Sequence, residues 1–268
     1  MSQEFYAVDL PGKSLYDKEF SVSIRKITPI EQKYILSLSQ KEQKSSRDYI
    51  NFIKKLISID NQEVQFEDLF WFDVQYLLYF IRFTTYSKYP IKLIFKCNNY
   101  NEELGEFCTN QIKKEITRQD LKIYTPEDLP DLVTTIELEN LGKTKIRNKT
   151  MRDDINIENF IKKQRLDSED SYMRLLLLDL SLISTDHSLE ELYDLAEKGE
   201  ITASDIIGIE SWFTENIWGV KEEVTIKCDK CGKEETRDYS LSLEDFFSAV
   251  WYKRFVRKRM VANEGITS

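Results

Sequence analysis

Four cysteines lie in two strand-like segments that each run into a Lys-Cys pair, and they constrain the fold more than any other feature. The later segment reads VTIKCDKCGK and holds Cys228 and Cys231 in a CxxCG turn between two predicted strands. The earlier segment reads IKLIFKC and ends at Cys97. Tyr100 stands where a second cysteine would complete that motif, and the next cysteine is Cys108. The sequence therefore predicts two β-hairpins that carry every thiol of the chain.

These thiols are the candidate ligands of a metal ion. Two thiolates from each hairpin would complete one tetrahedral site, and structural zinc takes four nitrogen or sulfur ligands. The two-residue spacer of CxxCG lets both sulfurs face one ion, and its glycine permits the tight turn. The sequence holds a single histidine, so no other set of such ligands competes. The predicted ligands of one structural zinc ion are Cys97, Cys108, Cys228 and Cys231.

A second interpretation of the cysteines stays open, because the ten-residue spacer between Cys97 and Cys108 is not a standard zinc-ribbon spacing. In this interpretation the thiols are free and buried on two hairpins that bind no metal. A disulfide is disfavoured, since no signal peptide is predicted and cytoplasmic thiols stay reduced. A redox-active CxxC is also disfavoured, because nothing around Cys228 predicts the strand-to-helix setting that activates a thiolate.

Composition narrows the class of protein. The 268 residues are 41% hydrophobic and 12% aromatic, which is enough for one large or two small folded domains. No apolar run approaches the roughly 18 residues of a membrane span. The net charge of -9 argues against general nucleic-acid binding, which depends on neutralising phosphates. The motifs GxGxxG, GxxxxGK[ST], HExxH and GxSxG are absent, so we expect neither an enzyme nor a small-molecule substrate.

Helices are predicted ahead of a cysteine hairpin in both halves of the chain. In residues 1–150 an alternating strand at 20–27 leads into a capping box of Thr28 and Glu31, which predicts the start of a helix. Helical spacing follows at residues 49–57 and 72–83, and a further hairpin is predicted over residues 131–150. In residues 151–268 we predict helices at residues 157–163, 172–184, 189–198, 205–218 and 243–260.

The predicted fold class is α+β, mainly helical with two small cysteine-containing β-hairpins. We divide the chain into residues 1–150, with the first hairpin, and residues 151–268, with the CxxC hairpin and a basic terminal helix. The repeated order of elements indicates a divergent internal duplication of one module. Two unrelated helical segments remain the alternative.

Several motifs, taken in order, resemble those of the T4-type bacteriophage baseplate protein family. They are Leu10-Pro11, the stretch VSIRKITPIEQK at 22–33, DxxYLLYFIR at 73–82 with Tyr86-Ser87, the strand into Cys97, and LEDFF after the CxxCG hairpin. The resemblance implies a structural or assembly role in the baseplate hub of a contractile-tailed phage, without enzymatic chemistry. It further implies other hub proteins as partners, the host cytoplasm as the place of assembly, and the virion tail as a final location. The incomplete first cysteine motif and the basic carboxyl terminus depart from the family pattern.

Two further features bear on partners. The aromatic run from Phe66 to Phe80 exceeds what one amphipathic helix face hides, so it is either core or a partner-binding patch. The basic segment from Lys253 to Arg259 is either a solvated helix end or a docking element for an acidic tail protein. A zinc-ribbon nucleic-acid adaptor is the rival hypothesis from another class. It requires the basic helix and the CxxC turn to form one positive face.

Overall fold

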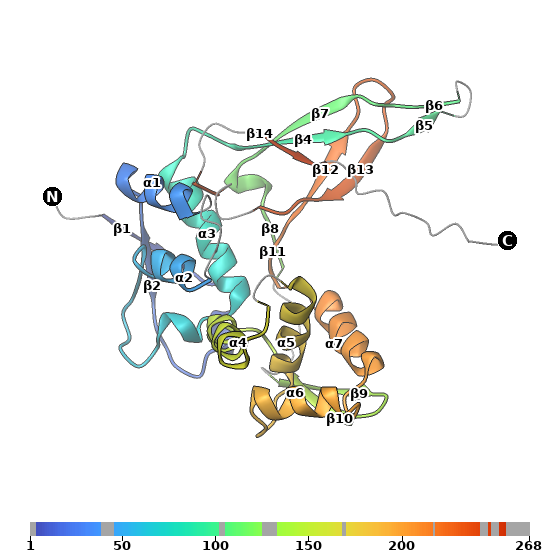
Figure 1. The fold of residues 1–268 in the computed structure, drawn as a ribbon. Coiled ribbons are helices and arrows are strands. Elements are labelled where there is room, and N and C mark those ends of the chain that lie inside the picture. Colours follow the sequence, from blue (N-terminus) through green and yellow to red (C-terminus); the bar gives the residue numbers. More distant parts are fainter. Residues whose placement is uncertain are drawn as a thin grey trace.

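The computed structural model describes residues 4–38, 46–101, 105–124, 133–167, 170–216, 218–241, 246–247 and 252–255. Seven α-helices and six small sheets lie in this part of the chain (Figure 1). The prediction of a mainly helical fold is therefore wrong, and the fold is mixed α+β. Several strands span only two to four residues and pair with distant segments, so local periodicity underestimates them.

The elements follow one another along the chain as helices interspersed with short strands. The helices are α1 (Pro29–Leu38), α2 (Ser46–Lys54), α3 (Trp71–Thr85), α4 (Met151–Gln164), α5 (Ser171–Leu182), α6 (Leu189–Glu197) and α7 (Ala203–Glu215). The strands are β1 (Phe5–Val8), β2 (Val22–Arg25), β3 (Ile57–Ile59), β4 (Ile91–Lys96), β5 (Tyr100–Asn101), β6 (Glu106–Phe107), β7 (Gln111–Ile116), β8 (Lys122–Tyr124), β9 (Val133–Leu138), β10 (Gly142–Arg147), β11 (Gly219–Lys221), β12 (Glu223–Lys227), β13 (Glu234–Asp238) and β14 (Tyr252–Phe255). Short 3-10 turns are η1 (Lys13–Leu15), η2 (Phe66–Asp68) and η3 (Arg118–Asp120).

The amino-terminal region is a three-stranded antiparallel sheet in the order β1-β2-β3, beside helices α1 to α3. The predicted capping box at the start of α1 is confirmed. The Glu31 backbone N–H donates to the Thr28 hydroxyl (3.3 Å), and the Thr28 N–H donates to the Glu31 carboxylate (2.9 Å). Arg25 also pairs with Glu31 at 2.6 Å and, as the largest cause, lowers the Glu31 pKa to about 2. The cap therefore ties α1 to β2.

A buried carboxylate fixes the amino-terminal loop against α3. Asp73 is fully buried in the first turn of the helix and accepts the Gly12 backbone N–H (2.8 Å) and the Tyr16 hydroxyl (2.7 Å). The Tyr16 oxygen accepts the N–H of Phe70, the residue before the helix (2.9 Å). Burial raises the Asp73 pKa to about 6, although both hydrogen bonds oppose the shift. The loop, the helix start and the carboxylate thus form one buried network.

Helices α4 to α7 and the β9–β10 hairpin form the lower part of the molecule in Figure 1. The hairpin predicted over residues 131–150 is confirmed, with Gly142 opposite Leu138 at its turn. Capping boxes start three of these helices. The predicted Ser188–Glu191 pair starts α6, and pairs led by Thr150 and Thr202 start α4 and α7. A hydrophobic cluster of its own, including Ile146 and Ile209, holds this region together.

Three further strand pairs extend from the body as a β-arm, the name we give to β4 with β7, β5 with β6, and β12 with β13 (Figure 1). Strands β4 and β7 pair antiparallel from Ile91–Ile116 to Lys96–Gln111, and β12 contacts β7. The helix predicted over residues 243–260 is wrong for 252–255, which form β14 and pair parallel with β4. Of the rest of that predicted helix, residues 246–247 are helical, and 243–245, 248–251 and 256–260 lie outside the described residues. Backbone pairing with the edge of β4 therefore outweighs the helical periodicity of these four residues.

The main hydrophobic core joins the amino-terminal sheet, α3 and the β-arm, and it includes Leu77, Phe95 and Ile226. The aromatic run is mostly core, as one of its two interpretations predicted. Its buried members are Phe66, Phe70, Phe72 and Tyr79, whereas Trp71, Tyr76 and Phe80 are partly exposed. Among the described helices, none combines the length and the apolar character needed to cross a membrane.

A candidate four-cysteine metal centre

The first hairpin brings Cys97 and Cys108 together despite their unusual spacing. Cys97 follows the last residue of β4, and its N–H donates to the Asn110 carbonyl (2.8 Å). The spacer folds back as the two-residue strands β5 and β6, which pair Tyr100 with Phe107. The Cys108 N–H then donates to the Asn99 carbonyl (2.7 Å). A small antiparallel extension therefore replaces the missing CxxC turn and returns the chain to the same place.

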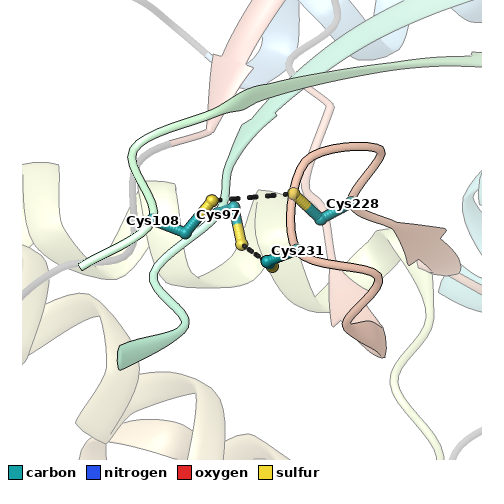
Figure 2. Close-up of side chains that lie close together, drawn as sticks. All are labelled: Cys97, Cys108, Cys228 and Cys231. Atoms are coloured by element: carbon teal, nitrogen blue, oxygen red, sulfur yellow. Dashed lines mark hydrogen bonds between the residues drawn. The ribbon is translucent and has the colours of Figure 1, made fainter. Parts of the chain in front are cut away.

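The second hairpin holds Cys228 and Cys231 in a tight turn after β12. The Cys228 N–H donates to the Lys233 carbonyl (2.8 Å), and the Gly232 N–H donates to the Cys228 carbonyl (2.8 Å). Gly232 has φ +72°, a left-handed conformation that glycine adopts without a steric penalty. The expected need for glycine in this turn is thus confirmed, and both sulfurs of the turn face the first hairpin (Figure 2).

The structure gathers all four predicted ligand residues into one cluster. The Cys97 and Cys231 sulfurs are 3.6 Å apart, and the Cys108 and Cys228 sulfurs are 3.7 Å apart. All four sulfurs lie within 4.8 Å of one another. Each close pair joins one sulfur of the first hairpin to one of the second, as the dashed lines of Figure 2 show. In the part of the chain that the structure describes, no other group of histidine, cysteine or acidic residues has comparable geometry.

The spacing of the sulfurs fits a tetrahedral thiolate site. Four sulfurs at about 2.3 Å from a central zinc ion would lie about 3.8 Å from one another. The observed 3.6 and 3.7 Å are close to this edge length. They are far longer than the roughly 2.05 Å bond of a disulfide, and none of the cysteines is cross-linked. Three of the residues are buried and Cys231 is exposed, so the cluster opens to the surface on one side.

The electrostatic environment favours one thiolate without help from a cation. Burial raises the pKa of Cys228, but the backbone N–H groups of Cys231 and Lys230 and the side-chain amide of Asn110 outweigh it and lower the pKa to about 6. Burial, together with the neighbouring thiols, raises the pKa of Cys97 to about 12. A bound cation removes such a penalty, because it stabilises each coordinating thiolate. The residues therefore fit a divalent metal with soft ligands.

Asn110 also takes part in this site, although it was not among the predicted residues. The Asn110 side-chain amide donates to the Cys228 sulfur at 3.6 Å, across the two hairpins. Only its position two residues after Cys108 hints at this role, and an asparagine there is equally typical of a turn. The lone histidine, His187, lies exposed in the loop before α6, far along the chain from the cluster.

Comparison of the whole chain with known protein families identifies its class. The family model described as "T4 bacteriophage base plate protein" matches residues 6–248, which is nearly the whole chain and includes all four cysteines. The protein is therefore a structural protein of the bacteriophage baseplate. The chain belongs to the T4 baseplate family, as its motifs predicted, and this makes it a component of a phage tail with other phage proteins as partners. No curated protein and no solved structure matches the chain.

Proposed function

We propose that the protein is a hub subunit or hub assembly factor of a contractile-tail baseplate, and that it acts by binding other tail proteins rather than by catalysis. Family membership supports a structural role in the baseplate. The absence of the common catalytic motifs from the sequence is consistent with that role. Assembly in the host cytoplasm and incorporation into the tail follow from this proposal.

We further propose that Cys97, Cys108, Cys228 and Cys231 bind one structural zinc ion. When bound, zinc would neutralise the thiolates and cross-link the two hairpins. The observation that carries this proposal is the pairing of sulfurs 134 and 120 residues apart in sequence, at 3.6 and 3.7 Å. Coordination of one metal ion explains why the four sulfurs lie together and why they are spaced as observed. Free thiols would have no reason to adopt this arrangement.

The consequence of such a cross-link is a β-arm of fixed shape. The first hairpin spans residues 91–116 and the second spans residues 223–238. The cysteine cluster lies where their turns meet. Just beyond the cluster, the β5–β6 tip exposes Tyr100 and Phe107, with ring centroids 5.0 Å apart. Exposed aromatic side chains on a rigid support are typical of binding hot spots. The tip is therefore our first candidate for contact with another baseplate protein.

The rival nucleic-acid adaptor gains no support from the charges around the cluster. Residues 223–238 contain five carboxylates and four cationic side chains, so the CxxC hairpin has no excess positive charge. Neutralisation of phosphates requires such an excess. Protein binding is the function that the site supports best.

Co-purification from infected cells tests the hub assignment. Tagged protein is recovered under native conditions, and mass spectrometry identifies the associated chains. We expect a small set of baseplate hub proteins in constant ratio. Replacement of both Tyr100 and Phe107 by serine should weaken that association, whereas serine at the exposed Tyr172, on α5 and outside the β-arm, is the matched control. Recovery of tail-tube or capsid proteins alone would contradict the hub assignment.

A further inference from the structure

A second candidate binding site lies on the body of the molecule, away from the cysteine cluster. It is a pocket of about 610 Å³ formed where α3 ends and β4 begins, against strand β1 and the turn η3. Thirteen described residues line it. Their side chains indicate what the pocket can bind.

Five aromatic side chains are among the thirteen described residues that line the pocket. Phe80 and Phe83 come from α3, Tyr86 and Tyr89 from the turn after it, and Tyr6 from the edge strand β1. Tyr89 is 55% exposed, and the other four rings are partly exposed. This part of the aromatic segment is thus not absorbed by the core. An open wall of aromatic rings is suited to contact with apolar or planar groups.

The charged side chains among the described lining residues are both positive. They are Lys88 and Arg118, and no aspartate or glutamate of the described part of the chain lines the pocket. Both side chains are exposed, and neither forms an ion pair with a described residue. The central carbon of the Arg118 guanidinium lies 4.3 Å from the centroid of the Phe80 ring, a cation–π contact that holds the side chain against the wall. This is a local excess of positive charge on a chain whose net charge is -9.

A third cation lies directly behind the wall. The Arg82 side chain is buried, with its guanidinium 4.5 Å from the Tyr86 ring and one N–H donated to the Tyr89 carbonyl (3.1 Å). Its Nε and Nη1 atoms have no hydrogen-bond partner in the described structure. Burial lowers the Arg82 pKa, because it desolvates the charged form. A buried cation that pairs with no carboxylate of the described residues adds positive potential behind Tyr86 and Tyr89.

Two carboxylates that are near the lining residues in sequence are already engaged. Glu4 accepts the Tyr6 hydroxyl (2.6 Å). Asp120 accepts the Thr117 backbone N–H (2.8 Å) and hydroxyl (2.6 Å) and so caps η3. Neither lines the pocket. Among the described residues, neither carboxylate thus offsets the positive charge of Lys88 and Arg118.

We propose that this pocket binds an acidic segment of another baseplate protein, with carboxylates on Lys88 and Arg118 and an apolar side chain between the rings. The inference rests on the proposed function, since it assumes that binding to tail proteins is what the molecule does. Charge complementarity selects the occupant. A guanidinium held over an aromatic ring suits a carboxylate, and five rings supply apolar contact that a simple anion would not use. The acidic balance of the whole chain disfavours a long polyanion.

A direct binding experiment tests this inference without knowledge of the partner. The probe is a capped, fluorescein-labelled peptide that alternates glutamate with phenylalanine, followed by fluorescence anisotropy. The comparison probe has glutamine in place of glutamate. We expect saturable binding of the acidic peptide, at least tenfold weaker binding of the glutamine peptide, and weaker binding as salt is raised.

The variants locate the site. The pair Lys88→Glu and Arg118→Glu should weaken binding at least tenfold, and the neutral pair Lys88→Gln and Arg118→Gln should have a smaller effect in the same direction. The pair Lys143→Glu and Lys198→Glu gives the same change in net charge on the exposed surface of the α4–α7 region and should bind as the natural chain does. Equal binding by the pocket and control pairs would overturn the inference. So would the absence of saturable binding, or tighter binding of an oligonucleotide of equal charge.

Failure of this inference is distinguishable from failure of the proposed function. If the natural chain recovers hub proteins from infected cells and the Lys88→Glu, Arg118→Glu pair recovers them equally well, the pocket inference fails and the hub assignment stands. If the natural chain recovers no hub proteins, the hub assignment itself fails. Reduced recovery with the pocket pair, but not with the Lys143→Glu, Lys198→Glu pair, supports both.

Discussion

Removal of metal should lower the thermal stability of this protein without unfolding it at room temperature. The main core reaches from β2 through α3 to β12 and does not depend on the cysteines alone. Structural zinc sites bind with about 10–16 kcal/mol, so a dissociation constant of about 1 nM lies within their range. At about 1 µM free zinc, linkage then gives about 4 kcal/mol of stabilisation. For a chain of this size that corresponds to about 8–16 °C in melting temperature.

The exposed ligand gives the sharpest variant for this test. Cys231→Ser removes one sulfur from the surface side of the cluster and disturbs little packing, whereas substitution of the buried Cys228 would also disturb the core. We expect Cys231→Ser to melt near the natural chain when a chelator is present, and well below it when zinc is present. The variant should also respond much less to the chelator than the natural chain does.

Differential scanning calorimetry of both chains, each with zinc and with chelator, measures all four melting temperatures. An unchanged melting temperature of the natural chain on chelation would refute the reasoning. So would a Cys231→Ser deficit of the same size with and without zinc, because that deficit would belong to the turn and not to a metal.

Three other predictions concern the body of the molecule. Because burial raises the Asp73 pKa from its ordinary 3.8 to about 6, the folded state binds the extra proton between these values, so the contribution of Asp73 to stability should fall by about 3 kcal/mol as pH rises from about 4 to 7. Urea unfolding of the natural chain and Asp73→Asn across this range should show the variant gaining relative stability with pH, and a pH-independent difference would contradict it. Gly12→Ala should cost about 1–3 kcal/mol, since its Cβ would lie 2.6 Å from a Phe72 ring carbon and 2.7 Å from an Asp73 oxygen; denaturation with no loss of stability would show that the loop is free to move. The Arg25–Glu31 pair holds the Glu31 pKa near 2, so the stability difference between the natural chain and Glu31→Gln should shrink as pH falls from about 4.5 to 2, and a constant difference would argue against the pair.

Local features of this fold could be predicted from the sequence because their determinants are local. The capping boxes at Thr28 and Ser188 combine a hydroxyl with a glutamate three residues later, and both start helices as expected. The CxxCG turn was likewise readable, since Gly232 supplies the left-handed conformation that the turn requires. The family could be recognised because its motifs keep their order along the chain.

Features that depend on distant partners could not be predicted in the same way. The helical spacing predicted over residues 49–57 does not hold at its end, because α2 ends at Lys54 and Ile57 begins strand β3, which pairs with β2. Residues 252–255 lie within the predicted basic helix, yet they form a strand that pairs parallel with β4. The mainly helical class was wrong for this reason, because pairing across the chain outweighs local preference. The cysteine cluster was proposed from ligand count, but its interleaved sulfur pairs and the contribution of Asn110 emerge only from the meeting of the two hairpins.

The central claim is that one zinc ion joins the two hairpins, and X-ray absorption at the zinc edge tests it most directly. Protein purified without chelators should contain close to one zinc per chain, with a shell of four sulfurs at about 2.3 Å. Cys231→Ser should replace one of these sulfurs by a lighter ligand. Zinc far below one per chain, or a shell dominated by nitrogen and oxygen in the natural chain, would contradict the account and leave the cysteines as free thiols.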